Sequence, residues 1–238
     1  MNVVLDIDET FVQFVGKDDW EQGVPDKDKP KYKTTDRDED GFFILRPYFN
    51  EFFDFLFKNC KTVNLWTLSD EKYALKVAEM IGKFGKQQDK DWTISYVWHE
   101  QDSETSSNEY GGVKNLKWIR WDIDGSYMPF NTILIDDLPG NTQHEHNIKN
   151  GIQIRPFNPL GEKLKKEERT RTSIRDRHYT DLTKDDTLKK VIAKLQEVFD
   201  KPPFEGSTKV NVGGGRRKSK RVGKSKRVKR VVRKTSRR

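Results

Sequence analysis

Two acidic motifs follow short apolar runs, the position at which parallel α/β proteins carry their functional groups. Asp6 and Asp8 come after the run NVVL, and Asp136 and Asp137 come directly after the run TILI. Alternate residues of a strand share a side, so Asp6 and Asp8 can face one site. Carboxylates held this close are costly unless a cation neutralises them, and ligands made only of oxygen favour a hard ion such as Mg²⁺. The motifs therefore predict a carboxylate cluster around magnesium.

A hydroxyl and an ammonium group complete a set suited to phosphate esters. Thr67 follows a third apolar run, and Lys114 lies in the segment GGVKNL. A carboxylate can attack phosphorus in line while a metal and a lysine offset the charge on the equatorial oxygens. A second carboxylic acid can protonate the leaving oxygen and then activate water against the acyl-phosphate. The residue types thus indicate hydrolysis of a phosphate monoester.

Short apolar runs predict the strands that would position these groups. Residues 2–5, 63–66 and 132–135 are expected to be buried core strands, with further strands at 93–98 and 152–154. In parallel sheets ligands gather at the carboxyl ends of the strands, where Asp6, Thr67 and Asp136 would lie. Strands that alternate with helices predict a three-layer α/β fold with a parallel sheet.

Three amphipathic patterns predict the helices. The dipeptide Arg46-Pro47 opens the first, because proline is favoured in a first helical turn, and its apolar face consists of Phe49, Phe52, Phe53, Leu56 and Phe57. In the second, helical spacing relates Tyr73, Ala74, Val77, Ala78 and Ile81, and Gly82 or Gly85 is expected to end it. The third covers 184–199.

Composition divides the chain into a domain and a tail. Residues 16–41 are rich in Lys, Asp, Gly and Pro, which predicts an exposed excursion with little core. We expect one domain over 1–205, with a small insertion at about 86–112, and a Gly-linked basic tail over 206–238.

The net charge of +8 arises from the last 26 residues. Residues 213–238 hold 14 of the 46 Lys and Arg and no acid, which leaves 32 bases against 38 acids and a net charge of −6 on residues 1–212. The repeated KSKRV at 218–222 and 224–228 predicts a disordered, low-complexity segment. Clustered Lys and Arg over 216–238 predict attraction to nucleic acid or another polyanion, and a nuclear-localisation signal is compatible with this.

Other features bear on the compartment. Cys60 is the only cysteine, so an intrachain disulfide is excluded and a reducing setting is the simpler interpretation. No segment approaches 18 consecutive apolar residues, and Asp6, Asp8 and Glu9 lie where a signal peptide would be apolar. We expect a soluble intracellular protein, with the tail favouring the nucleus.

Taken in order, five motifs resemble those of a known superfamily. These are LDIDET, RPYFNEFFDFL, LWTLSDEKYALKVAEMI, GGVKNL and ILIDDLPGN, and together they cover roughly residues 2–157. They are similar to the haloacid-dehalogenase superfamily, and most closely to its TFIIF-associating and small C-terminal-domain phosphatases, the NLI-interacting-factor-like group. The resemblance implies a magnesium-dependent phosphatase that forms an aspartyl-phosphate, with a small insertion in place of a large cap. Its site would be open to a phosphorylated protein segment.

The resemblance also implies residue roles. Asp6 would be the nucleophile and a metal ligand, and Asp8 the general acid and base that also gives its main-chain carbonyl to the metal. Thr67 would bind the phosphoryl oxygens, Lys114 would hold phosphate and nucleophile, and Asp137 would ligate magnesium.

Two further roles and one departure complete the comparison with this family. Asp136 would orient Lys114 or metal-bound water. Tyr73 falls where the family has a substrate-contacting aromatic, although an aromatic packed on a helix face explains it equally well. No arginine lies between Thr67 and Lys114, where small members use one to read a neighbouring phosphate. The polymerase C-terminal domain is therefore a substrate suggested by the family and unsupported by these residues.

Three functional hypotheses follow. The first is a phosphoserine or phosphothreonine protein phosphatase similar to the polymerase C-terminal-domain phosphatases. The second is a phosphatase for nucleic-acid ends, recruited by the basic tail. The third is a catalytically weak adaptor that binds phosphopeptide, against which the intact set of Asp, Thr and Lys residues argues.

Overall fold

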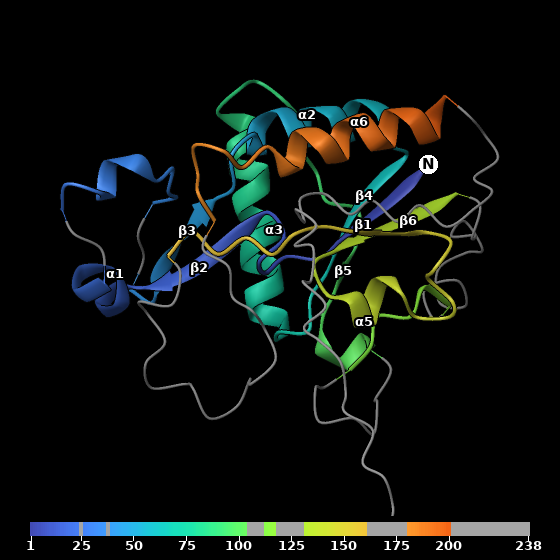
Figure 1. The fold of residues 1–238 in the computed structure, drawn as a ribbon, viewed down its shortest axis with the longest axis horizontal. Coiled ribbons are helices and arrows are strands. Elements are labelled where there is room, and N and C mark those ends of the chain that lie inside the picture. Colours follow the sequence, from blue (N-terminus) through green and yellow to red (C-terminus); the bar gives the residue numbers. More distant parts are fainter. Residues whose placement is uncertain (24–25, 37–38, 104–111, 118–130, 161–179, 201–238) are drawn as a thin grey trace, which may run out of the picture.

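The computed structural model describes residues 1–23, 26–36, 39–103, 112–117, 131–160 and 180–200. Its centre is a five-stranded parallel sheet in the order β5-β4-β1-β6-β7 (Figure 1). The strands are β1 (Asn2–Leu5), β4 (Thr62–Trp66), β5 (Val97–Trp98), β6 (Thr132–Asp136) and β7 (Gly151–Gln153). The predicted α/β class and parallel sheet are confirmed.

Helices cover one face of this sheet through a single large apolar cluster. The cluster joins Val3, Leu5, Leu65 and Ile135 of the strands to side chains of three helices. These helices are α2 (Phe49–Asn59), α3 (Glu71–Lys86) and α6 (Thr187–Phe199). Figure 1 shows α2 and α6 running side by side across the top of the view.

The opposite face of the sheet has a smaller core, and Leu116 belongs to it. Val4, Trp66 and Leu134 alternate with the residues of the first face and pack with Trp98 and Leu116. The short helix α5 (Pro139–Thr142) lies beside β6 and β7. Leu116 thus anchors the segment that carries Lys114.

A second, antiparallel sheet corrects the interpretation of residues 16–41. It consists of β2 (Val12–Gly16) and β3 (Gly41–Leu45), with Val12 opposite Leu45, and neither strand was predicted. Between them, α1 (Lys17–Gly23) places Trp20 on Phe42 and Tyr32, and only 2% of Trp20 is exposed. This excursion therefore has a small core of its own, because aromatic residues offset its polar composition.

Some predicted boundaries were wrong. Helix α3 passes through Gly82 and Gly85 and ends at Lys86, since Gly85 is needed for close contact with Trp92 and does not end the helix. Of the strand predicted at 93–98 only Val97–Trp98 pair with β4, and the fourth strand is shifted to Gly151–Gln153.

Several sequence-based predictions lie wholly or partly outside the described residues. The basic tail and residues 104–111 of the predicted insertion at 86–112 belong to them. Within the described ranges, no helix is both long and apolar enough to cross a bilayer. The division into a domain over 1–205 and a tail stays a prediction.

Candidate active site

The predicted residues meet at the carboxyl edge of the parallel sheet. Asp6 follows β1, Thr67 follows β4 and Asp136 ends β6, and β1 pairs with both neighbours. A cavity of about 160 Å³ opens at these strand ends, and its lining includes Asp6, Asp8, Thr67, Lys114 and Asp137. Residues separated by up to 131 positions in the chain thus line one cleft.

Lys114 lies between two carboxylates and is fully buried. Its ammonium donates a hydrogen bond to Asp6 and another to Asp136 Oδ2 at 2.9 Å. Burial opposes the charge, but the carboxylates of Asp136 and Asp6 raise the pKa of Lys114 above its ordinary value. Lys114 is therefore a permanent cation inside the site.

Both oxygens of the Asp6 carboxylate have donors. Lys114 donates to Oδ1, and the Thr10 hydroxyl donates to Oδ2 at 2.8 Å. Thr10 belongs to the turn after the acidic motif, and its carbonyl accepts a 2.8 Å hydrogen bond from the buried Arg46 guanidinium. These hydrogen bonds hold the Asp6 carboxylate in one orientation at the carboxyl edge of the sheet.

Asp8 has a different environment from Asp6. Its Oδ2 accepts hydrogen bonds of 3.4 Å from Thr67 and from Ser69, and its Oδ1 accepts one from the Tyr73 hydroxyl. Burial and the neighbouring Asp6 charge raise the pKa of Asp8 to about 6, against the opposing hydrogen bond from Tyr73. Asp8 therefore holds a proton at a higher pH than an ordinary aspartate, as an acid catalyst requires.

Three carboxylates lie close enough to share a metal ion. Asp6, Asp136 and Asp137 each offer an oxygen, and these atoms lie within 4.8 Å of one another. A donor set of carboxylate oxygens fits Mg²⁺. Asp6 and Asp137 line the cavity, whereas Asp136 is fully buried and does not, which makes Asp6 and Asp137 the better-placed carboxylates.

Two asparagines that the sequence analysis did not select hold the Lys114 backbone. Asn141 Oδ1 accepts a hydrogen bond from the Lys114 amide at 3.2 Å, and its Nδ2 donates to Asp136 Oδ2 at 2.9 Å. Asn147 Nδ2 donates to the Lys114 carbonyl, and its Oδ1 accepts from the Leu116 amide at 2.9 Å. The position of Asn141 five residues after Asp136 offers a weak sequence signal, whereas Asn147 offers none.

A parallel α/β sheet with a carboxylate pair, a lysine and a hydroxyl at its carboxyl edge defines a haloacid-dehalogenase-like phosphatase. The model of the family "NLI interacting factor-like phosphatase" matches residues 1–175, and the chain belongs to this family of phosphoric monoester hydrolases. The resemblance inferred from the motifs is thereby confirmed.

Relatives from two viruses agree with this assignment. Protein 355R of Invertebrate iridescent virus 6, described only as CTD phosphatase-like, is 28% identical over 162 residues, which cover 66% of this chain and 85% of that protein. Its namesake in Invertebrate iridescent virus 3 is 30% identical over 161 residues, covering 65% and 83%. The phosphatase is thus of the CTD phosphatase type.

A solved structure agrees with the fold. The structure of Fcp1, titled an essential RNA polymerase II CTD phosphatase, superposes with a TM-score of 0.53 at 16% identity. The match covers 84% of this chain and 62% of that one, so this chain spans less than two thirds of the solved chain. At this identity the likeness supports the fold alone.

Proposed function

We propose that this protein is a magnesium-dependent phosphoserine or phosphothreonine protein phosphatase that works through an aspartyl-phosphate on Asp6. The observation that carries the proposal is the different environment of two carboxylates two residues apart. Asp6 accepts hydrogen bonds from Lys114 and Thr10, while burial and the neighbouring Asp6 charge raise the pKa of Asp8 to about 6. Asp6 is suited to attack phosphorus, and Asp8 is suited to proton transfer.

In the first step, Asp6 attacks phosphorus and the bond from phosphorus to the ester oxygen breaks. Asp8 gives its proton to the departing oxygen, so that serine or threonine leaves as a neutral alcohol. Lys114 and the Thr67 hydroxyl offset the charge on the phosphoryl oxygens. In the second step, Asp8 takes a proton from water, which attacks phosphorus and releases inorganic phosphate and Asp6.

Asp6 and Asp137 would hold the magnesium ion, together with the main-chain carbonyl of Asp8. When bound, the ion supplies positive charge that lowers the repulsion between the anionic nucleophile and the anionic substrate. Asp136 keeps Lys114 in place and takes no direct part in the chemistry. The two hydrogen bonds it accepts besides that of Lys114, from the Leu138 amide and from Asn141, fit this supporting role.

A protein substrate fits the size of the site and the type of phosphatase. The cavity at the strand ends is small, at about 160 Å³, which suits a phosphoryl group on a short side chain. The Tyr73 hydroxyl donates a hydrogen bond to Asp8, which lines the cavity. Tyr73 is therefore close enough to be proposed as a substrate contact. Phosphorylated nucleic-acid ends are the alternative substrate class, favoured only by the basic tail.

Two measurements test the proposal. With a small aryl phosphate and Mg²⁺ we expect turnover by wild type and by Asp89→Asn, an exposed control carboxylate, and none by Asp6→Asn. Phosphopeptides offered beside 3′- and 5′-phosphorylated oligonucleotides should be the better substrates. A preference for the oligonucleotides would show that the substrate is a nucleic-acid end and not a protein. Full activity of Asp6→Asn would exclude Asp6 as the nucleophile.

A further inference from the structure

A series of buried hydrogen bonds leads from the Asp6 carboxylate away from the catalytic cavity. The Thr10 hydroxyl donates to Asp6 Oδ2 at 2.8 Å, and the Thr10 carbonyl accepts a hydrogen bond from Arg46 Nη1 at 2.8 Å. The same guanidinium donates to both oxygens of Asp185, from Nε at 2.8 Å and from Nη2 at 3.3 Å. The series thus joins the acidic motif after β1 to a residue near the start of α6.

Asp185 also binds the first residue of α6. Its Oδ1 accepts hydrogen bonds from the Thr187 amide at 3.1 Å and from the Thr187 hydroxyl at 2.5 Å. The first amides of a helix have no partner within the helix, and Asp186, the residue directly before α6, makes no capping hydrogen bond with its side chain. Asp185 therefore connects the beginning of α6 to the Arg46 guanidinium.

Packing fixes both ends of this connection. Leu188 and Val191 hold α6 in the large apolar cluster that covers the sheet. Arg46 is fully buried, with its guanidinium 5.3 Å from the centre of the buried Phe157 ring. Because water does not readily replace a lost partner at buried groups, each donor in the series depends on its protein neighbour. A shift of Asp185 is therefore passed on to Arg46 and from there to Thr10.

We infer that Asp185 is a positioning residue for catalysis, which transmits the position of α6 to the Asp6 carboxylate through Arg46 and Thr10. This inference rests on the proposed function, since it requires Asp6 to attack phosphorus. In-line attack depends on the orientation of the nucleophile, and a misplacement of about 1 Å can cost up to about 100-fold in rate. The described lining of the cavity includes neither Asp185 nor any residue of α6, so the effect on the reaction is indirect.

A double-mutant cycle separates this role from a purely structural one. Asp185→Asn should lower kcat for an aryl phosphate with Mg²⁺ by about tenfold and change KM by less than about twofold, at a temperature at which the variant is folded. Thr10→Val lacks the hydroxyl that orients Asp6. In that background Asp185→Asn should lower kcat by less than about twofold, because coupled residues are not additive. Equal falls in both backgrounds would overturn the inference.

Thr187→Val tests the same connection from within α6 and keeps the ion pair between Arg46 and Asp185. It removes the hydroxyl that donates to Asp185 Oδ1 and leaves the amide in place. This variant therefore provides the result if Asp185→Asn does not fold. We expect kcat to fall by about twofold to fivefold when Thr10 is present and to change little in Thr10→Val. A wild-type kcat in Thr187→Val would contradict a role for α6.

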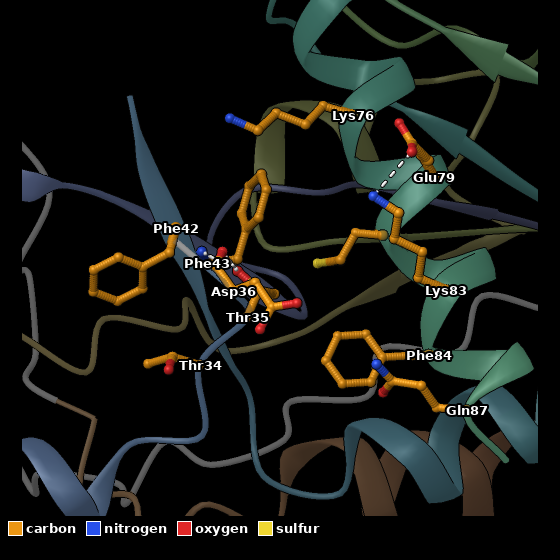
Figure 2. Close-up of a pocket in the computed structure, with 11 residues that line it drawn as sticks. Thr34, Thr35, Asp36, Phe42, Phe43, Lys76, Glu79, Lys83, Phe84 and Gln87 are labelled. Carbon is orange, nitrogen blue, oxygen red and sulfur yellow. Dashed lines mark hydrogen bonds and ion pairs between the residues drawn. The ribbon is translucent and has the colours of Figure 1, made fainter. Parts of the chain in front are cut away.

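Two control variants remove interactions outside this series. Figure 2 shows the exposed ion pair between Glu79 and Lys83 on α3, with 3.0 Å between Nζ and Oε1, and Glu79→Gln should keep the wild-type kcat. Asn150→Ala removes a buried hydrogen bond of 2.7 Å to the Thr132 carbonyl, and it should lower stability while keeping kcat. A tenfold loss of kcat in Asn150→Ala would show that destabilisation alone explains the effect of Asp185→Asn.

The wild-type enzyme distinguishes failure of this inference from failure of the proposed function. Absence of aryl phosphate hydrolysis by wild type would overturn the proposed function and the inference together. Wild-type hydrolysis that Asp185→Asn and Thr187→Val leave unchanged would overturn the inference alone.

Discussion

At the residue scale, identical side chains receive different roles from their neighbours. Asp6, Asp8 and Asp136 are all aspartates at one sheet edge, yet their hydrogen-bond donors differ. Asp6 accepts from Lys114 and Thr10. Asp8 accepts from Tyr73, Thr67 and Ser69, and Asp136 accepts from Lys114, Asn141 and the Leu138 amide. The types of these residues and their order in the sequence were enough to predict that they lie close together at the sheet edge. The hydrogen bonds that separate their roles come in part from Thr10 and Asn141, to which the sequence analysis gave no role.

Asn147 is expected to position Lys114 for catalysis. Asn147→Ala removes the hydrogen bonds to the Lys114 carbonyl and from the Leu116 amide, so the ammonium loses its fixed position. We predict a fall in kcat of about 10- to 100-fold with a smaller change in KM, measured with aryl phosphate well below the melting temperature of the variant.

A matched buried asparagine separates this effect from lost stability. Asn150 donates to the Thr132 carbonyl at 2.7 Å, at the opposite end of β6 from Asp136. Asn150→Ala should lower the free energy of unfolding by about 1–3 kcal/mol and leave kcat near the wild-type value. Equal losses of kcat in the two variants would argue that Asn147 is merely structural.

At the scale of elements, buried parallel strands were predictable because they are short apolar runs that end in polar groups. The β2–β3 hairpin was not, since its two strands are separated by 24 intervening residues, 17–40, and only their long-range pairing identifies them. The end of α3 was not predictable either, because sequence alone cannot show whether a glycine ends a helix or allows a neighbouring side chain to pack closely.

Gly85 and Gly82 offer a direct test of close packing on α3. A Cβ at Gly85 would lie 2.8 Å from Trp92 Cβ and Cγ, whereas at Gly82 the nearest atom is the Trp92 carbonyl at 3.7 Å. Gly85→Ala should therefore destabilise the protein by about 1–3 kcal/mol, and Gly82→Ala should stabilise it by about 0.5–1 kcal/mol. Urea unfolding measures both, and stabilisation by Gly85→Ala would refute the packing explanation.

The ion pair between Arg46 and Asp185 predicts how stability depends on pH. Burial alone would raise the pKa of Asp185, but the Arg46 guanidinium, which Asp185 contacts at 2.8 Å, and hydrogen bonds from Thr187 hold it below the usual 3.8. A carboxyl group whose pKa is lower in the folded protein than in the unfolded chain stabilises the fold at every pH above its unfolded-state pKa. This contribution is lost as the pH falls through the folded-state pKa.

Asp185→Asn should consequently cost about 3–5 kcal/mol near neutral pH, because it leaves the buried Arg46 without its anion. The difference in unfolding free energy from wild type should stay constant at higher pH and shrink below about pH 4. Urea titrations across this range measure it. A difference that grows on acidification would contradict the sign of the effect.

At the scale of the whole molecule, charge is distributed unevenly along the sequence, with a mildly acidic stretch over residues 1–212 and a strongly basic one over 213–238. Removal of residues 213–238 changes the net charge from +8 to −6. We predict that this truncation abolishes retention on DNA or heparin at low salt and leaves aryl phosphate turnover unchanged. In the full chain, retention should weaken steeply as salt rises, and retention that survives truncation would show that the tail is not the polyanion site.

The central claim is that Asp6 receives the phosphoryl group, and chemical trapping tests it most directly. Wild-type enzyme turning over a phosphopeptide with Mg²⁺ is quenched in acid, and any acyl-phosphate is reduced with borohydride, which converts the modified aspartate to homoserine. Mass spectrometry should find homoserine at position 6 and nowhere else. Homoserine at another aspartate, or its absence from an enzyme that accumulates an acyl-phosphate, would contradict the account.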